Sequence, residues 1–151
     1  MITKKLKYTD FDGREREETV RFNLTEKEVF DLEFGTLGGI SEFYQRIIEA
    51  QNTPEIIAAI DKIVLAAYGI KTADGRGFQK SKEISDEFKF TQGYSNFMME
   101  LYTDDEKAFT FIKELIPEEV IKKIEARLKS AAEKQEKKKI PFEPQDHKRK
   151  E

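Results

Sequence analysis

Two short segments near the start of the chain alternate between apolar and polar side chains. Residues 4–8 and 17–22 each carry two large apolar side chains at alternate positions, between lysines, acids and other polar residues. The sequence between them, Asp10-Phe11-Asp12-Gly13, contains typical turn-forming residues. A period of two on both sides of such a turn predicts a half-exposed β-hairpin.

After residue 23 the apolar side chains recur every three or four residues, which predicts helices. Thr25 and Glu28 have the spacing of a capping box, and Thr53-Pro54 places a cap before a proline at the first helical position. The run from Ile56 to Ala67 has the most apolar face. Predicted helix starts lie at Thr25, Ser41, Thr53, Ser81, Thr103-Asp104 and Pro117, with ends or breaks at Gly35, Gly38-Gly39, Gly69 and Gly93.

Residues 68–81 form a charged segment interrupted by three glycines. Gly69 suits the left-handed end of the preceding helix. We interpret the segment as a sharp joint between two helices that carry aromatic residues.

These patterns predict a mainly α fold, with an N-terminal β-hairpin followed by a bundle of about five to seven helices. A chain of 151 residues is most simply one domain. We place that domain at residues 1–132, with the hairpin in 1–22 and the helices in 25–132. Charge and proline dominate residues 133–151, which predicts a disordered, basic, flexible tail.

Composition excludes several classes of protein. The chain has no cysteine, so it has neither disulfides nor thiolate metal sites. No apolar run approaches the ~20 residues of a membrane-spanning helix, and the N-terminus lacks the apolar region of a signal peptide. We therefore expect a soluble intracellular protein.

Charge is unevenly distributed. The net charge is −3, made up of +5 in residues 122–151 (11 basic minus 6 acidic) and −8 in residues 1–121 (16 minus 24). The basic helix from Lys122 to Lys139 leaves open a small regulatory or nucleic-acid-binding protein. Lysines near a helix end also complement the helix dipole and aid solubility, so we expect no nucleic-acid partner.

No set of residues has the pattern of a catalytic or metal site. The single histidine, His147, lies in the predicted tail, where nothing would orient its ring. Gly75-Arg76-Gly77 lacks the ending of a phosphate-binding loop. The motif at residues 10–13 lacks the further oxygen ligands of a calcium loop. We predict no catalytic residue, no cofactor and no metal.

Aromatic residues are frequent, with 12 Phe and 5 Tyr, and many lie between Phe78 and Phe111. Rings at helical spacing usually pack into the core, as we expect for Tyr94, Phe97 and Phe109. However, residues two apart on a helix do not share a face, so some rings must reach a second surface. We predict that this surface binds a partner. The predicted partner-binding residues are Tyr68, Phe78, Phe88, Phe90, Tyr94 and Phe111.

Several of these motifs resemble those of the tail assembly chaperones of long-tailed bacteriophages, particularly phages of Gram-positive hosts. The resemblance covers residues 3–117, and Gly77 stands where a polar or charged residue is usual. It rests on Tyr8-Thr9-Asp10-Phe11-Asp12-Gly13, on Phe22-Asn23-Leu24-Thr25-Glu26, and on Ala67-Tyr68-Gly69 followed by Asp74-Gly75-Arg76-Gly77-Phe78-Gln79-Lys80-Ser81, Phe88, Thr91, Tyr94 and Leu101.

The resemblance implies a non-enzymatic siphovirus protein of the host cytoplasm that is absent from the finished virion. Its implied partners are the tape measure protein, the major tail (tube) protein and other copies of itself. A longer form made by ribosomal frameshifting is also implied, and Lys137-Lys138-Lys139 is where a slippery codon run could lie.

Overall fold

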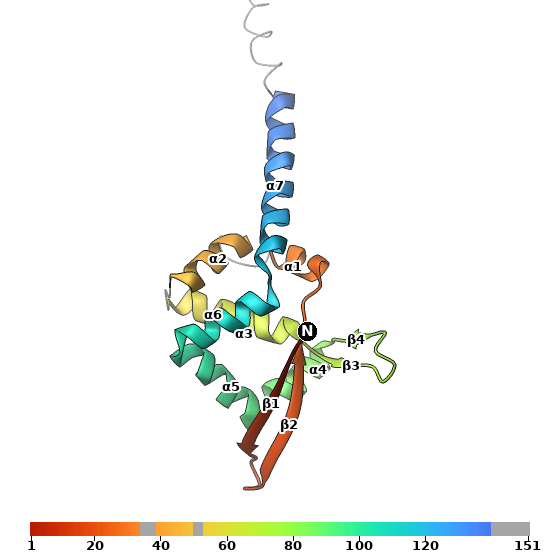
Figure 1. Ribbon diagram of the computed structural model, residues 1–151, viewed down its shortest axis with the longest axis vertical. Coiled ribbons are helices and arrows are strands. Elements are labelled where there is room, and N and C mark those ends of the chain that lie inside the picture. The colour runs from red at the N-terminus through yellow and green to blue at the C-terminus, as the bar shows by residue number, and fades with distance from the viewer. Residues whose placement is uncertain (34–38, 50–52, 140–151) are drawn as a thin grey trace, which may run out of the picture. The chain divides into compact units, whose positions relative to one another are not determined.

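The computed structural model describes residues 1–33, 39–49 and 53–139 of the chain (Figure 1). Within these ranges it contains seven helices and four strands. The chain divides into two compact units, Met1–Pro117 and Glu118–Glu151. The predicted class, an N-terminal β-hairpin followed by a mainly helical chain, is confirmed.

The predicted hairpin consists of β1 (Ile2–Thr9) and β2 (Glu15–Phe22), paired antiparallel along their whole length from Ile2 opposite Phe22 to Thr9 opposite Glu15. One face carries the alternate apolar side chains, of which Val20 and Phe22 are buried. The other face carries only threonine and charged residues, which are exposed except for the half-buried Arg21. This difference between faces explains the period of two.

A second hairpin extends the sheet to the order β1-β2-β3-β4. Its strands are β3 (Tyr68–Lys71) and β4 (Phe78–Gln79). The prediction of a joint with a left-handed Gly69 is therefore wrong. The chain passes from helix into extended backbone at Tyr68, and Gly69 pairs with Arg21 of β2.

The helices of the first unit begin largely at the predicted caps. Hydroxyl oxygens of Thr25, Thr53 and Ser81 each accept a backbone N–H three residues later. The elements are α1 (Glu26–Glu33), α2 (Gly39–Ile48), α3 (Pro54–Ala67), α4 (Lys82–Lys89), α5 (Gln92–Thr103) and α6 (Asp105–Leu115).

Two predicted helix signals are wrong. Ser41 is not a cap, because α2 already begins at Gly39. Gly93 does not break the chain but lies in the first turn of α5, which Thr91 caps. The predicted helix start at Thr103-Asp104 is confirmed: Asp104 caps α6, and its carboxylate accepts the N–H groups of Glu106 and Lys107. The predicted break at Gly35 and the Gly38 half of the Gly38-Gly39 junction lie outside the described residues.

The predicted apolar face of α3 is confirmed, because Ile56, Ile60, Ile63, Val64 and Ala67 are all buried. α6 differs from the prediction at Phe109, which the sequence assigned to the core. Its buried residues are Ala108, Phe111, Ile112 and Leu115, whereas Phe109 is only half-buried.

The described part of the second unit is α7 (Glu118–Lys139), which begins with Glu118 and Glu119 at the end of the helix that favours negative charge. The helix includes residues 133–139, which the sequence places in the predicted tail. The remainder of that tail, residues 140–151, lies outside the described residues.

Candidate functional site

A cluster of aromatic rings surrounds Phe22, which is completely buried on β2. The ring centroid of Phe22 lies 5.4 Å from that of Phe97 and 5.3 Å from that of Phe111. It lies 5.9 Å from the rings of both Tyr68 and Phe88. Tyr94 joins the cluster through Phe88, at 5.2 Å. Four of the six predicted partner-binding residues therefore belong to one aromatic cluster.

Part of the predicted surface lies inside this cluster. Phe88 and Phe111 are each only 3% exposed, so most of each ring packs in the core and offers a partner little surface. Phe90, two residues beyond Phe88, is 70% exposed. The rule that rings two apart do not share a face holds. In α6, however, the outer ring is Phe109, which the sequence assigned to the core.

Tyr94 and Tyr68 lie at the border of the aromatic cluster. Both are half-buried. The Tyr94 hydroxyl is buried without a hydrogen-bond partner in the described residues. Burial, reinforced by the negative charges of Glu18 and Glu87, raises the pKa of Tyr68. Both rings pack mainly against the other rings of the cluster.

Phe78, the remaining predicted residue, holds the second hairpin together. A Cβ atom on Gly69 would lie 2.6 Å from the Cε2 atom of Phe78, so the ring occupies the space that a side chain at position 69 would need. The Lys80 Nζ atom lies 5.6 Å from the centroid of the Phe78 ring. It also donates hydrogen bonds to a Glu28 carboxylate oxygen at 2.6 Å and to the Asn23 carbonyl oxygen at 2.7 Å.

The Lys80 contact changes the chemistry of the capping box at the start of α1. Partial burial disfavours the Glu28 carboxylate, but hydrogen bonds from Lys80 and from the Thr25 N–H, with the charge of Lys80, lower its pKa overall. Sequence reasoning found Glu28 as a capping residue. It missed Lys80, because 52 residues separate the two.

An open groove with a volume of about 560 Å³ lies in the first unit between β1, α5 and α6. We call it the β1 groove. Residues 4–7 of β1 form one wall. The buried side chains of Phe97, Leu101 and Phe111 contribute its apolar lining. Its charged and polar lining consists of Lys4, Lys5, Lys7, Asn96, Glu100, Asp104, Glu106, Lys107, Thr110 and Glu114.

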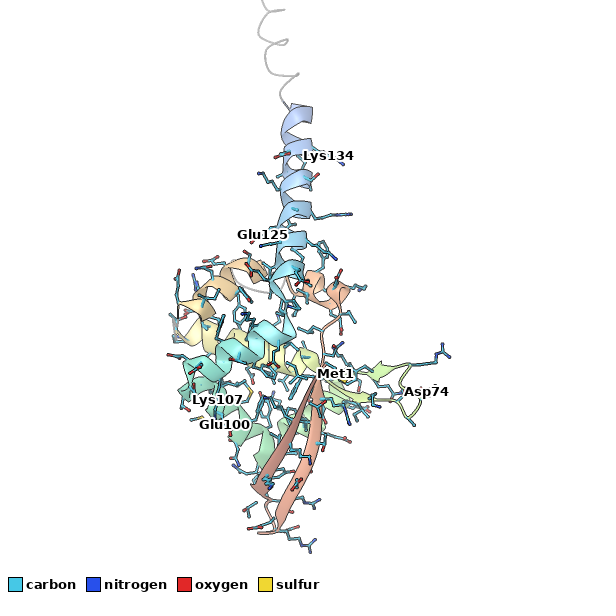
Figure 2. All side chains as sticks on the ribbon, in the orientation of Figure 1. Met1, Asp74, Glu100, Lys107, Glu125 and Lys134 are labelled. Carbon is cyan, nitrogen blue, oxygen red and sulfur yellow. The ribbon has the colours of Figure 1, made fainter. Side chains whose placement is uncertain are left out.

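Charges of both signs lie close together at this groove. Figure 2 shows Glu100 and Lys107 near one another on α5 and α6, and their charged atoms are 4.0 Å apart. Both side chains are well exposed, so this ion pair adds little stability. Sequence reasoning missed the groove, because its walls come from segments about ninety residues apart.

Tyr8 connects β1 with α5. Its ring packs so closely on Gly93 that a Cβ there would lie 2.7 Å from the Tyr8 Cε1 atom. Burial, together with a hydrogen bond and the charge of Glu18, raises the pKa of Tyr8 to about 12. Tyr8 therefore stays protonated at physiological pH, as an uncharged packing residue.

The described residues offer binding surfaces more than reactive groups. Among residues 1–33, 39–49 and 53–139, no charged or polar side chain is fully buried and no group of three acidic or histidine residues could hold a metal ion. None of the helices in these ranges is long and apolar enough to cross a bilayer. Large apolar side chains left exposed include Phe11, Ile48, Ile70, Phe90 and Met99.

The chain was compared with protein families, curated proteins and solved structures. The model of a protein family described as phage tail assembly chaperone matches residues 1–150. No curated protein and no solved structure matches the chain.

Proposed function

This chain belongs to the phage tail assembly chaperone family, and from that premise we propose that it binds the tape measure protein and helps to recruit tail tube subunits. It does so in the host cytoplasm, without catalysis, and does not remain in the virion. The family match over residues 1–150 carries the proposal. It favours this function over the alternative of a nucleic-acid-binding protein.

The β1 groove supports the proposal physically. A tail protein before assembly exposes apolar stripes that would otherwise aggregate. A groove with an apolar lining and a charged rim can cover part of such a stripe while its rim stays hydrated. Several self-associated copies bound along one long client would hold it with a higher avidity than any single copy. The affinity of each individual site can therefore be weak.

Phe90 is the predicted partner-binding residue that remains most accessible. An exposed phenylalanine ring is a frequent anchor of protein contacts. We propose that Phe90, with Met99 on α5, takes part in binding the client or another copy of the chaperone, which we expect to self-associate.

The proposed function is tested by co-expressing the chaperone with the tape measure protein of the same phage and measuring co-purification. Asn96→Trp should fill the β1 groove and reduce co-purification about tenfold. Ser95→Trp is the matched control, because Ser95 is also exposed on α5 but does not line the groove. Equal co-purification by both variants would remove the groove from the proposal. If the unmodified chaperone captures no tail protein, the proposed function itself is wrong.

Phe90→Ser and Phe88→Ser separate a binding role from a folding role. Phe90→Ser should weaken co-purification while leaving thermal stability nearly unchanged, because the ring is exposed. Phe88→Ser should instead reduce the helical circular dichroism or its thermal midpoint, because the ring is buried. Unchanged co-purification by Phe90→Ser would exclude this ring as a contact.

A further inference from the structure

No strand of the described chain pairs with the outer edge of β1. β1 is the first strand in the order β1-β2-β3-β4 and pairs with β2 alone. An exposed edge strand presents backbone N–H and C=O groups that can pair with another extended chain.

The turn geometry identifies which backbone groups face that edge. The Asp10 N–H donates to the Arg14 carbonyl oxygen at 2.8 Å, and this pair continues the register in which Thr9 lies opposite Glu15. Hydrogen-bonded pairs alternate along an antiparallel ladder. Ile2, Lys4, Leu6 and Tyr8 therefore bond to β2. The backbone groups of Thr3, Lys5, Lys7 and Thr9 point outward.

All four outward-facing residues are exposed. Residues 4–7 of the same edge also form a wall of the β1 groove. A strand added to β1 would therefore run along the groove. Its side chains would alternate between two environments, as in any strand. One set would face Phe97, Leu101 and Phe111 in the groove, and the other would stand beside Lys5 and Lys7.

Charge indicates which kind of strand fits. β1 contains three lysines and no acidic residue, whereas its present partner, β2, contains Glu15, Glu17 and Glu18. The Nζ atoms of Lys5 and Lys7 lie 3.9 Å and 3.8 Å from Glu17 carboxylate oxygens. A second copy pairing through its own β1 would bring lysines opposite lysines, and like charges in that position destabilise a sheet.

We propose that the outer edge of β1 binds an extended segment of a partner protein as a fifth strand, with acidic and apolar side chains alternating along that segment. The backbone of Thr3, Lys5, Lys7 and Thr9 supplies the hydrogen bonds. The lysines select the acidic side chains, and the β1 groove receives the apolar ones. The inference deepens the proposed function. It rests on that function only in identifying the partner as a tail protein.

A fluorescein-labelled peptide of about ten alternating glutamate and valine residues is a direct probe, because it has the length of a natural strand. It should bind the full-length protein in a fluorescence anisotropy titration, and added salt should weaken the binding. The same peptide with lysine in place of glutamate should not bind. Equal binding of both peptides, or of neither, would overturn the proposal.

Amide hydrogen exchange followed by NMR tests the geometry on the unmodified protein. In the free protein, the amides of Lys4, Leu6 and Tyr8 should exchange slowly and those of Lys5 and Lys7 rapidly. The glutamate–valine peptide should slow exchange at Lys5 and Lys7 about tenfold or more. Peptide binding without this change would overturn the proposal. The proposal would also be overturned if a higher protein concentration, without peptide, slowed exchange at Lys5 and Lys7. A second copy of the chain would then be the occupant of the edge.

Lys5→Pro removes one outward N–H and leaves the bonds to β2 in place. It should weaken peptide binding about tenfold, whereas the matched control Lys5→Gln, which keeps the N–H, should weaken it only about two- to threefold. If Lys5→Pro does not fold, the amide exchange of the unmodified protein with and without the peptide decides whether the proposal stands.

The tape measure co-purification separates this inference from the proposed function. Co-purification by a folded Lys5→Pro variant that no longer binds the peptide would overturn the edge as the route to the client and leave the proposed function standing. If the protein binds the peptide but captures no tail protein, the proposed function is wrong and the strand-binding edge of β1 stands.

Discussion

The two hairpins of the sheet use the same turn chemistry. In the β1–β2 hairpin, the Asp10 carboxylate accepts two backbone N–H groups of its turn, and Gly13 has a φ of +80°. In the β3–β4 hairpin, the Asp74 carboxylate accepts the Arg76 N–H, and Gly75 has a φ of +77°. Each glycine donates its N–H to the carbonyl three residues earlier, at 3.0 Å. The local sequence is thus sufficient to reverse the chain in both places.

The hairpins differ in what holds their strands. β1 and β2 have eight residues each and one buried face, whereas β3 and β4 have four and two. Figure 2 shows Asp74 at the tip of the second hairpin, away from the helices. The shortest ion pair that the structure gives for the first hairpin joins Asp10 to Arg16, six residues apart, within the same hairpin. That of the second joins Lys80 to Glu28.

This difference separates chain reversal from strand formation. A long alternating pattern specifies strands by itself, because it puts the large apolar side chains of both strands on one face. Strands of two to four residues show too little alternation for that. The β3–β4 hairpin therefore depends on contacts that are distant in sequence, through Gly69, Phe78 and Lys80.

The largest expected effect is at Phe22, where the two hairpins meet. Phe22→Ala removes a completely buried ring that contacts four other rings. The free energy of unfolding should fall by about 3–5 kcal/mol, measured by urea denaturation. A loss below about 1 kcal/mol would show that the aromatic cluster does not hold the first hairpin in place.

Gly69→Ala should disrupt the second hairpin more selectively. The added Cβ would meet the Phe78 ring at 2.6 Å and the Gln79 carbonyl oxygen at 2.9 Å. We expect a loss of about 1–3 kcal/mol, with NMR shift changes concentrated in residues 68–80. Gly77→Ala is the control, because its closest contact is the Thr72 Cγ2 atom at 3.1 Å, and it should cost less. Equal costs would contradict close packing at Gly69.

Replacing the two turn glycines compares the hairpins directly. Gly13→Ala and Gly75→Ala each place a Cβ in the left-handed region without a steric contact, at a cost of about 1 kcal/mol. Gly13→Ala should lower global stability by that amount. Gly75→Ala should mainly speed amide exchange within β3 and β4, if the second hairpin opens locally. The same global loss for both would show that the hairpins unfold as one unit.

The smallest effect concerns the contact between Lys80 and Glu28. The pKa of Glu28 is lower in the folded protein than its usual value of about 4.3, so the ionised group stabilises the fold above that pH. The stabilisation should disappear as pH falls through the folded-state pKa. Glu28→Gln keeps the capping acceptor but loses the charge, and should cost about 0.5–1 kcal/mol at pH 7.

The pH series is read from thermal midpoints of the unmodified protein and Glu28→Gln between pH 7 and pH 3. The two curves should converge below about pH 4. A difference that stays constant over the whole range would indicate a cause other than the Glu28 charge.

The sequence predicted part of the candidate site. It singled out aromatic residues, four of which the structure brings into one cluster, and it predicted that rings two apart on a helix face differently. It could not tell which ring of each pair points inward, since Phe109 and Phe111 are equivalent until the rotation of α6 against β2 and α5 is known. The β1 groove could not be predicted, because it exists only where β1, α5 and α6 meet.

By itself, the sequence determined the first hairpin, the starts of α1, α3 and α4, and the buried face of α3. Each depends on residues within a few positions of one another: alternation around a turn, a hydroxyl three residues before an N–H, or apolar side chains at helical spacing. Tertiary structure alone explains why a glycine stands at position 93 within a helix, because the Tyr8 ring occupies the space that a side chain there would need. It also decided that residues 68–79 form two strands, because β2 offers an edge for β3. Backbone pairing between distant segments leaves little trace in either segment's own pattern.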